Sequence, residues 1–436
     1  MGNSGASSEE NTALSKAARW QRTRLALLCW VAVVGCGGGV YVCYRLGIGR
    51  LAPYEYQCTL LGIWLFIAGL LGVCLARYFQ PMEEKRVRRI SGLAGPLVFF
   101  LIFLGLYGMA QGVYWKLNRN RAETIERIGS HSRGDSYRFD RVLGYGPRPQ
   151  FTADARLTVR GELVFDYTYT TDSHKRRNVP SQANTNTQRE RAILFFGGSF
   201  AFGEGVNDEE TLPNQLALLE PDTTMYNYAF SGYGPGQMLA RLESYDVRAD
   251  VPEATVAAVY TFIPNHVRRV IGAYSVINWS RHSPYYHFGG DGEVVRSGSF
   301  QGERAGLTQW YDFLQGDQVF QYYQLDFPIF LGKKEFQLTA AIIEAAAEEF
   351  TAQFASDDFY VLFYPETPSN EFDTRIMIPY LEKRGIRVLD YTALLTGKPE
   401  DYFFLPYDSH PRPTAHKVVA ERLRGEALFR GVQTKP

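Results

Sequence analysis

The stretch Ala192-Ile193-Leu194-Phe195-Phe196-Gly197-Gly198-Ser199-Phe200 decides the fold class of this chain. Its first five residues form a short, uninterrupted apolar run, which is typical of a buried parallel strand. A glycine pair then indicates a turn, and a serine follows it directly. The stretch therefore predicts a strand that ends in a turn carrying Ser199 as a candidate nucleophile.

Strand and helix patterns alternate on the C-terminal side of this stretch. Short β-branched and aromatic runs indicate strands, and apolar residues at steps of three and four indicate amphipathic helices. The predicted strands cover residues 192–196, 225–230, 255–262, 359–364 and 387–389, and the predicted helices cover residues 211–220, 237–245, 336–354 and 414–428. Such alternation predicts a parallel sheet with helices on both faces, and ligands bind at the carboxyl ends of the strands in such sheets.

An aspartate and a histidine lie two residues apart near the end of the chain, in Asp408-Ser409-His410-Pro411. A serine hydroxyl is a poor nucleophile until a base takes its proton. His410 is the best candidate base, because most of the other histidines lie outside the α/β pattern. In an extended loop residues i and i+2 point the same way, so Asp408 can hold the imidazole ring. With Ser199, the pair predicts a nucleophile, a base and an orienting acid.

Two further residues follow predicted strands closely and offer donors for an oxyanion. Gly232, in Ser231-Gly232-Tyr233-Gly234, lets the backbone approach a ligand closely. Asn265, in Ile263-Pro264-Asn265-His266, offers a side-chain amide. The backbone amide of Ser199 offers another donor. Taken singly, Gly232 is a turn glycine and Asn265 a loop asparagine; their order and their positions after strands favour the oxyanion role.

These four blocks resemble those of the SGNH hydrolases, also called the GDSL esterase and lipase superfamily, over about residues 190–430. The resemblance implies a flavodoxin-like three-layer α/β/α sandwich. It implies a catalytic triad of Ser199, Asp408 and His410, and an oxyanion hole of Ser199, Gly232 and Asn265. It also implies that no metal or cofactor takes part.

The sequence departs from the family pattern in three blocks. Gly198 stands where the family usually has aspartate, so a contact that supports the first block is absent. Pro264 and His266 flank Asn265 where Gly-x-Asn-Asp is usual. One residue separates Asp408 from His410 where many members have two. This spacing resembles the alginate O-acetyltransferase-like branch, which works outside the membrane on polysaccharide.

Three stretches without charged residues, at 25–44, 56–76 and 90–115, each reach the ~20 residues that a helix needs to cross a bilayer. Basic residues gather before the first stretch and between the second and third, whereas only Arg45 and Arg50 lie between the first and second. The positive-inside rule then predicts a multi-pass membrane protein with a cytoplasmic N-terminus. Three spans place the residues after about 115 in the periplasm or outside the cell.

Composition separates an apolar N-terminal part from a polar remainder. We expect a cytoplasmic polar tail at 1–24, a three-helix transmembrane region at 25–115, a connector with a small β-rich module at 116–190, and the hydrolase-like domain at 191–436. Within the last domain, the segment 280–330 is an insertion rich in aromatic residues. Its side chains form either the core of the insertion or a cleft for a sugar or a partner.

Charge and cysteine content bound the partners and the cross-links. The formal net charge of the 436-residue chain is zero, so charge gives no reason to expect nucleic acid as a partner. All five cysteines lie in or beside the apolar part, so no disulfide can stabilise the polar part. The absence of cysteines from the polar part does not identify its cellular compartment, because oxidising compartments permit disulfides without requiring them.

Three functional hypotheses follow from the site and the predicted topology. The first is a membrane-anchored serine esterase that removes acyl groups, above all O-acetyl, from envelope or exported glycans or from small esters, through an acyl-Ser199 intermediate. The second is an O-acyltransferase that acetylates a polysaccharide with the same residues. It would need a membrane partner that supplies the acyl group, because three spans are few for importing a donor. The third is a catalytically inactive binding or scaffold protein, favoured by Gly198 and opposed by the intact Ser199, Asp408 and His410.

Overall fold

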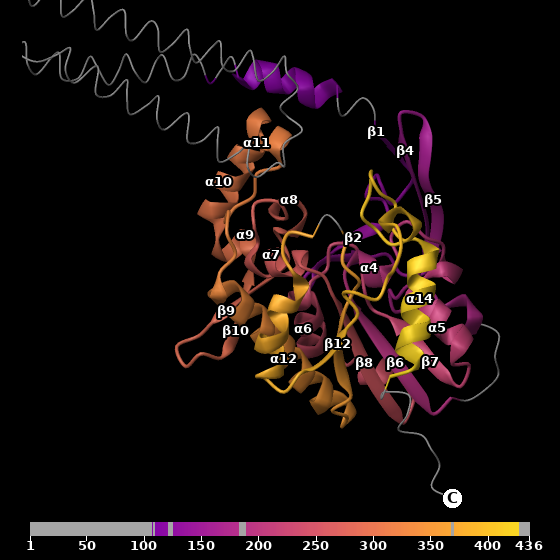
Figure 1. Ribbon diagram of the computed structural model, residues 1–436. Helices are drawn as coiled ribbons and strands as arrows, with labels where there is room; N and C mark the ends of the chain where they lie inside the picture. Colours follow the sequence, from indigo (N-terminus) through magenta and orange to yellow (C-terminus); the bar gives the residue numbers. More distant parts are fainter. Residues whose placement is uncertain (1–106, 108–109, 121–124, 183–188, 368–369, 427–436) are drawn as a thin grey trace, which may run out of the picture. The chain divides into compact units, whose positions relative to one another are not determined.

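The computed structural model describes residues 107, 110–120, 125–182, 189–367 and 370–426 (Figure 1). The chain forms two compact units, one of residues 1–117 and 317–323 and the other of residues 118–316 and 324–436. The predicted tail and the spans at 25–44 and 56–76 lie outside the described residues, as does the span at 90–115 apart from residues 107 and 110–115. Within the described ranges, no helix is both long enough and apolar enough to span a membrane.

The described part of the first unit consists of a helical segment at residues 110–117 and the short helix α11 (Gln318–Tyr323). The hydroxyl oxygens of Tyr114 and Tyr323 lie 2.6 Å apart. The backbone N–H of Gln318 donates to Oε1 of Gln111 at 2.8 Å. The last residues of the third predicted span therefore pack against a segment about 200 residues further along the chain.

Five parallel strands form the central sheet of the second unit, in the order β12-β11-β8-β6-β7. The strands are β6 (Arg191–Gly197), β7 (Thr223–Asn227), β8 (Thr255–Phe262), β11 (Phe359–Phe363) and β12 (Arg387–Asp390). Counted along the chain, the first strand lies between the second and the third, which is the flavodoxin-like doubly wound order. The predicted α/β fold with a parallel sheet is thus confirmed, and the strand predicted at 255–262 has the bounds of β8.

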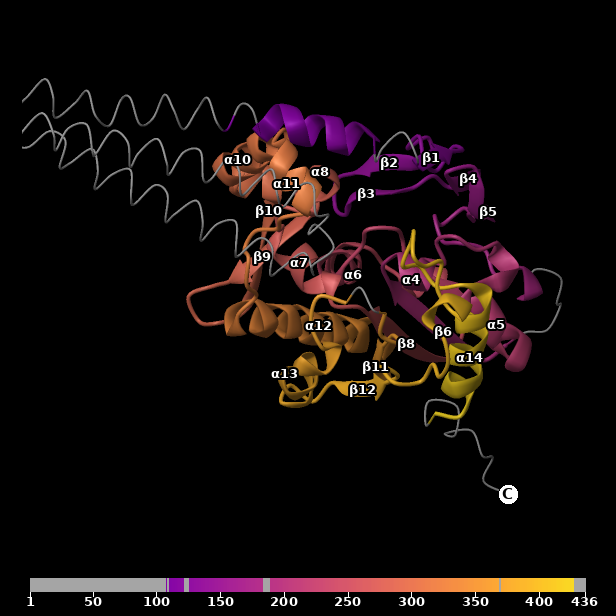
Figure 2. The same ribbon diagram turned by 45° about the horizontal axis from the view of Figure 1, so that its top comes forward.

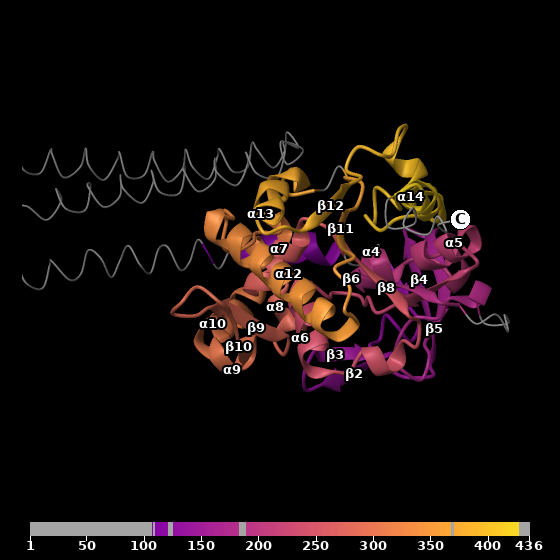
Figure 3. The same ribbon diagram turned by 90° about the horizontal axis from the view of Figure 1, so that it is seen from below.

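Helices cover both faces of this sheet (Figures 1 and 3). One face carries α5 (Leu212–Leu219) and α14 (Pro413–Arg424); the other carries α6 (Pro235–Ser244), α7 (Asn265–Ile271), α12 (Lys333–Phe354) and α13 (Ile378–Glu382). Residues of β6 alternate between the two cores, because successive side chains of a strand point to opposite faces. Ile193 and Phe195 pack with α5 and α14, and Leu194 and Phe196 pack with α6 and α12.

Two antiparallel sheets precede the parallel one in the chain. One has the order β1-β4-β5, and the other pairs β2 with β3. Their strands are β1 (Ile125–Ile128), β2 (Tyr137–Asp140), β3 (Gly144–Pro147), β4 (Thr152–Val159) and β5 (Glu162–Thr170). They lie on the side of the parallel sheet where α4 begins (Figure 2). The buried face of β5 joins the same hydrophobic core as α6, which makes these strands part of the larger unit.

The segment predicted as an aromatic insertion forms a hairpin followed by short helices. Its elements are β9 (Pro284–Phe288), β10 (Val294–Ser299), α9 (Phe300–Glu303), α10 (Ala305–Gln315) and α11, and α8 (Ile277–Ser280) precedes them. Tyr286, Phe300 and Tyr311 are buried. Trp310 and Phe313 are 55% and 72% exposed, and their rings stack at 5.6 Å. Aromatic side chains of this segment therefore lie both in a core and on a surface.

Two predicted strands are too long at their ends: the strand at 359–364 by one residue, since β11 stops at Phe363, and the strand at 225–230 by three. The sequence pattern continues to Phe230, but β7 stops at Asn227. Oδ1 of Asn227 accepts the backbone N–H of Ala229 at 3.1 Å, and Nδ2 donates to the carbonyl of Ala201 at 3.1 Å. The asparagine side chain thus turns the chain by accepting the Ala229 N–H, while the backbone N–H groups of Tyr228 and Phe230 still donate to the carbonyls of Phe195 and Gly197 in β6 at 2.8 and 3.3 Å. The apolar residues after it, which suggested a strand, are core residues of a loop.

Candidate active site

Ser199 begins α4 (Ser199–Phe202), a single helical turn that follows β6 with one residue between them. Gly197 allows this turn, because its φ is +143° and an added Cβ would lie 2.9 Å from the carbonyl oxygen of Thr261. The Ser199 carbonyl accepts the backbone N–H groups of Gly203 and Glu204 at 2.8 and 3.0 Å. Ser199 is 5% exposed. Its hydroxyl makes no hydrogen bond to any residue that the structure describes, so it is unengaged.

Asp408 and His410 form a hydrogen-bonded pair in the loop before α14. Oδ1 of Asp408 lies 2.6 Å from Nδ1 of His410 and accepts the backbone N–H of His410 at 2.8 Å. One carboxylate oxygen therefore fixes both the ring and the chain that carries it. Burial opposes protonation of the ring, but the carboxylates of Asp408 and Glu204 outweigh it and raise the pKa of His410 to about 9.

The imidazole lies beside the turn that carries Ser199. The rings of His410 and Phe200 are 5.6 Å apart, and Phe200 is the residue after the serine. No hydrogen bond joins Ser199 to His410 within the described ranges. The charged group that faces Nε2, the nitrogen turned away from Asp408, is Glu204 at 3.7 Å. The structure thus brings the predicted base and acid into contact and leaves the predicted nucleophile separate from them.

Gly232 lies in the loop between β7 and α6 with φ +80°, a conformation that favours glycine. An added Cβ would overlap the hydroxyl of Tyr145 and lie 3.0 Å from Nε1 of Trp279. The Tyr145 hydroxyl donates to the carbonyl of Ser231 at 2.9 Å, and Tyr145 belongs to β3. A residue of the antiparallel strands therefore braces the predicted oxyanion loop.

Asn265 is the first residue of α7, and its side chain is held from within that helix. Oδ1 accepts Nε–H of Arg269 at 2.8 Å. A guanidinium donates and never accepts, so this bond directs the amide oxygen to Arg269 and leaves the Nδ2 hydrogens free for another acceptor. The donors that the predicted oxyanion role of Asn265 would use are thus not taken by Arg269, and the role stays a prediction.

The departure at Gly198 has a structural counterpart in Arg269. An added Cβ on Gly198 would overlap Nη1 of Arg269 and lie 2.9 Å from the carbonyl of Tyr233, which accepts a hydrogen bond from that same nitrogen at 2.6 Å. The space beside the nucleophile turn is thus taken by a guanidinium. Burial lowers the pKa of Arg269, and its charge together with burial lowers the pKa of His266 well below the usual range.

Two charged side chains of this site were missed from the sequence. Arg269 follows Asn265 by one helical turn, and that i, i+4 spacing was an available signal. Glu204 lies in a Gly-Glu-Gly turn after α4, where Oε2 accepts the Ser231 hydroxyl at 2.7 Å. Burial raises the pKa of Glu204, but nearby His410 and His131 and the bond from Ser231 together lower it. The sequence offers no comparable signal for Glu204 beyond a charge between two glycines.

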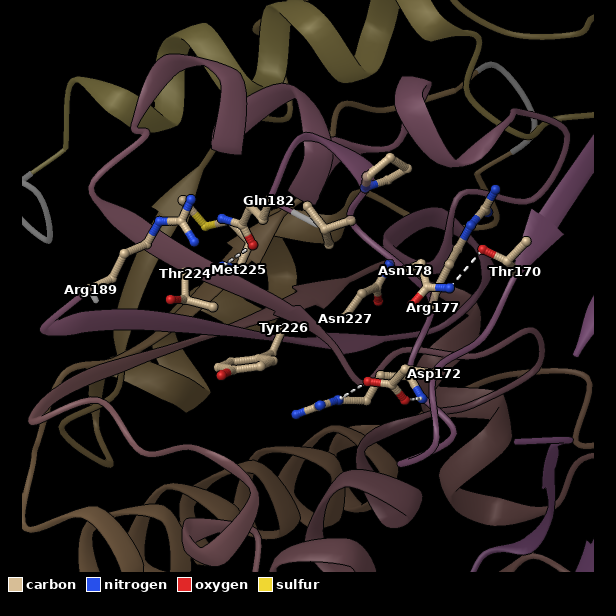
Figure 4. Close-up of a pocket in the computed structure, with 13 residues that line it drawn as sticks. Thr170, Asp172, Arg177, Asn178, Gln182, Arg189, Thr224, Met225, Tyr226 and Asn227 are labelled. Atoms are coloured by element: carbon tan, nitrogen blue, oxygen red, sulfur yellow. Dashed lines mark hydrogen bonds and ion pairs between the residues drawn. The ribbon is translucent and has the colours of Figure 1, made fainter. Parts of the chain in front are cut away.

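A pocket of about 460 Å³ lies elsewhere, along the edge strand β7 (Figure 4). It contains none of the predicted site residues. Two pairs of its polar side chains contact each other within the wall: Arg176 with Asp172 at 2.6 Å, and Asn178 with Thr170 at 2.8 Å. Among the described residues, no three His, Cys, Asp or Glu side chains gather closely enough to hold a metal ion.

No protein-family model matches the sequence, and no curated protein matches it. Solved structures do show similarity at low identity. A GDSL-family lipolytic protein from Veillonella parvula is 13% identical over 55% of this chain and 99% of its own, with a TM-score of 0.33. A catalytic mutant of Axe2, an acetylxylan esterase from Geobacillus stearothermophilus, is 13% identical over 55% of this chain and 95% of its own, with a TM-score of 0.31. Esterase EstA from Pseudoalteromonas sp. is 14% identical over 53% and 94%, with a TM-score of 0.30. The chain thus has structural similarity to GDSL lipolytic esterases over about 55% of its length.

Proposed function

We propose that this protein is a serine esterase that hydrolyses acyl esters, with O-acetyl groups of envelope or exported glycans as its leading substrate. The observation that carries the proposal is the Asp408–His410 pair beside the turn that holds Ser199, whose hydroxyl makes no hydrogen bond to a residue that the structure describes. This combination supplies a nucleophile, a base and an acid that orients the base.

Acylation would begin when the neutral ring of His410 takes the Ser199 proton at Nε2. Oγ then bonds to the ester carbonyl carbon, and the carbonyl π electrons move to oxygen. The backbone N–H groups of Ser199 and Gly232 and the Nδ2 hydrogens of Asn265 would donate to that oxyanion. When it collapses, the C–O bond to the alcohol breaks and the imidazolium gives its proton to the leaving oxygen.

Deacylation would repeat these steps with water as the nucleophile. His410 takes a proton from water, and the hydroxide oxygen attacks the acyl carbon. Collapse of the second oxyanion releases the carboxylic acid, and Ser199 regains its proton from His410. If a sugar hydroxyl took the place of water, the same residues would perform transfer, and a membrane protein that presents the acyl group would be the required partner.

Exposed aromatic rings beside the site support a sugar-containing substrate. Trp279 is 43% exposed, and its Nε1 lies 3.0 Å from the Cβ position of Gly232. Tyr407 is 46% exposed and precedes Asp408 in the chain. An aromatic ring with a polar edge provides an apolar face for the C–H groups of a pyranose and a donor for its hydroxyls.

The location of the enzyme is part of the proposal. The charge-free stretches at 25–44, 56–76 and 90–115 and the distribution of basic residues favour three spans, a cytoplasmic N-terminus and a periplasmic or extracellular catalytic domain. A cysteine-labelling scan with a membrane-impermeant reagent on intact cells would test it. Labelling of residues after 120 only after the cells are broken would contradict this orientation.

The test of the esterase proposal is release of p-nitrophenol from p-nitrophenyl acetate by the full-length protein in detergent. We expect Ser199→Ala to abolish release with folding intact, His410→Ala to be nearly as damaging, and Asp408→Asn to lose somewhat less. Retained activity in the Ser199 variant would remove the assignment of the nucleophile.

Added acceptors distinguish the alternatives. With an acetylated oligosaccharide, free acetate supports the esterase, and acetyl groups on a second glycan support the transferase. A folded protein that releases nothing and also resists fluorophosphonate labelling would favour the inactive binding protein.

A further inference from the structure

Glu204 is held at a fixed place beside the nucleophile turn. Glycines flank it on both sides, with φ of +88° at Gly203 and +91° at Gly205. Its backbone N–H donates to the carbonyl of Ser199 at 3.0 Å. The guanidinium of Arg177 donates to the carbonyls of Gly203 and Val206, each at 2.6 Å. The backbone that carries the Glu204 side chain is therefore held on both sides.

The carboxylate of Glu204 touches two other parts of the proposed site. Oε2 accepts the hydroxyl of Ser231, the residue before Gly232, at 2.7 Å. The same oxygen lies 3.7 Å from Nε2 of His410, and both of these side chains are 19% exposed. One partly buried carboxylate oxygen thus faces the oxyanion loop and the outer nitrogen of the base.

Titratable and charged groups surround the His410 ring from several elements. They are Asp408 in the same loop, Glu204 after α4, Arg269 on α7, His131 before β2 and His416 on α14. The two carboxylates favour the imidazolium and the guanidinium opposes it, whereas the two other imidazoles would oppose it only when protonated. Burial keeps His131 and His416 neutral by lowering the pKa of each, that of His416 to about 3. The carboxylates therefore dominate the charge around the ring.

We propose that Glu204 is a positioning residue of the acyl-transfer site, which ties the Gly232 loop to the nucleophile turn and holds His410 in its protonated form at rest. The inference rests on the proposed esterase function of Ser199 and His410. The chemical consequence is that His410 is a stronger base, but its neutral form is less populated. Only the neutral ring can take the serine proton, since an imidazolium cannot. The enzyme would then work best at alkaline pH, where the ring is neutral.

The test separates the effect of the Glu204 charge from that of its hydrogen bond to Ser231. Glu204→Gln removes the charge and keeps an oxygen that can accept the Ser231 hydroxyl. Ser231→Ala removes this hydrogen bond and keeps the charge. Glu209→Gln, at an exposed residue of the 3₁₀ turn Asp208–Glu210, is the matched control. The rate of fluorophosphonate labelling of the full-length protein in detergent is measured from pH 6 to 10 for each variant.

We expect wild-type labelling to rise about tenfold per pH unit and to level off near pH 9. Glu204→Gln should move this limb to lower pH by about one unit, because it removes an opposite charge within about 4 Å. Ser231→Ala should keep the limb in place and lower the plateau by about tenfold, through misplacement of the oxyanion loop. If the pH at which the labelling rate rises is unchanged in Glu204→Gln, or shifts equally in Ser231→Ala, the proposed role of the Glu204 charge is overturned.

A second readout does not depend on reactivity. The Cε1 signals of isotopically labelled histidines, with His410 assigned from a His410→Asn sample, report the ionisation of the ring directly. A midpoint lower by about one pH unit in Glu204→Gln supports the inference, and an unchanged midpoint refutes it. If the midpoint moves but the protein is never labelled at Ser199, the esterase proposal fails and the electrostatic role of Glu204 stands.

Discussion

Replacing Arg177 by methionine should lower the free energy of unfolding more than the loss of any other ion pair described above. The side chain of Arg177 is 0% exposed and pairs with Asp208 at 2.8 Å. It also donates to the carbonyls of Phe202, Gly203 and Val206 at 2.6–2.8 Å. Methionine fills much of the volume but donates nothing.

The size of the effect follows from what is left behind. The Asp208 carboxylate keeps the N–H and the hydroxyl of Thr170, at 2.9 and 2.5 Å, so it is only partly unsatisfied. Val206 loses its donor altogether. Breaking a buried ion pair by removing one partner costs about 3–5 kcal/mol. The partial compensation at Asp208 places the expected loss in unfolding free energy at the lower end, about 3 kcal/mol.

Urea unfolding of the full-length protein in detergent, followed by tryptophan fluorescence, would measure this loss. The matched control is Arg156→Met, because Arg156 pairs with Asp166 at 2.5 Å with side chains that are 53% and 42% exposed. Solvent screens such an exposed pair, so Arg156→Met should lose much less unfolding free energy than Arg177→Met. If both variants lose the same stability, burial does not strengthen the Arg177 pair and the reasoning fails. A shift of the labelling rise to another pH in Arg177→Met would further support the view that the hydrogen bonds of Arg177 position Glu204.

Three other predictions concern the site. Gly198→Ala should displace Arg269 and reduce esterase activity by about tenfold, since the added Cβ overlaps the guanidinium; Gly290→Ala, where nothing lies within 4 Å, should leave activity unchanged. Trp279→Ala should raise the KM for an acetylated oligosaccharide about tenfold and leave that for p-nitrophenyl acetate unaltered; equal changes for both would argue against a sugar platform. Because the folded pKa of His410, about 9, lies above the unfolded value, its stabilisation is complete below pH ~6.5 and is lost as the pH rises to 9. Urea unfolding at pH 6, 7.5 and 9.5 should therefore show falling stability, and a rise would contradict the assignment.

The sheet could be predicted from the sequence because its strands are buried on both faces. In β6 and β8 nearly every residue is buried, so each strand reads as an unbroken apolar run bounded by glycine, proline or charge. The prediction went wrong at the end of β7, where the residues after Asn227 are also buried. An apolar run shows that a segment is buried but not where its backbone turns. The turn is set by the hydrogen bonds of one asparagine side chain, which composition cannot show.

The predicted site residues differ in how far chemistry alone can identify them. Taken alone, Asp408 and His410 would more often be a surface Asp-x-His pair; their order after Ser199 and the resemblance of the four blocks to a known family favoured a triad, and their roles stay predictions until activity is measured. Arg269 was within reach, because a residue one helical turn from Asn265 must share its face.

Glu204 and Tyr145 were out of reach for a different reason. Glu204 contacts Ser231 and His410 because three loops meet at one end of the sheet. They are the glycine turn after α4, the loop between β7 and α6, and the loop before α14. Tyr145 reaches Ser231 from β3, 86 residues away in the chain. Neither contact has a local pattern, so no periodicity or motif could report it. Both side chains act through Ser231 on the loop of Gly232, one from the nucleophile turn and one from the antiparallel strands. The geometry of the oxyanion loop therefore depends on the β-rich segment, and a fragment that begins at residue 191 would lack the Tyr145 brace. We expect such a fragment to bind substrate and turn it over poorly, whereas one that begins near residue 120 should keep the complete site.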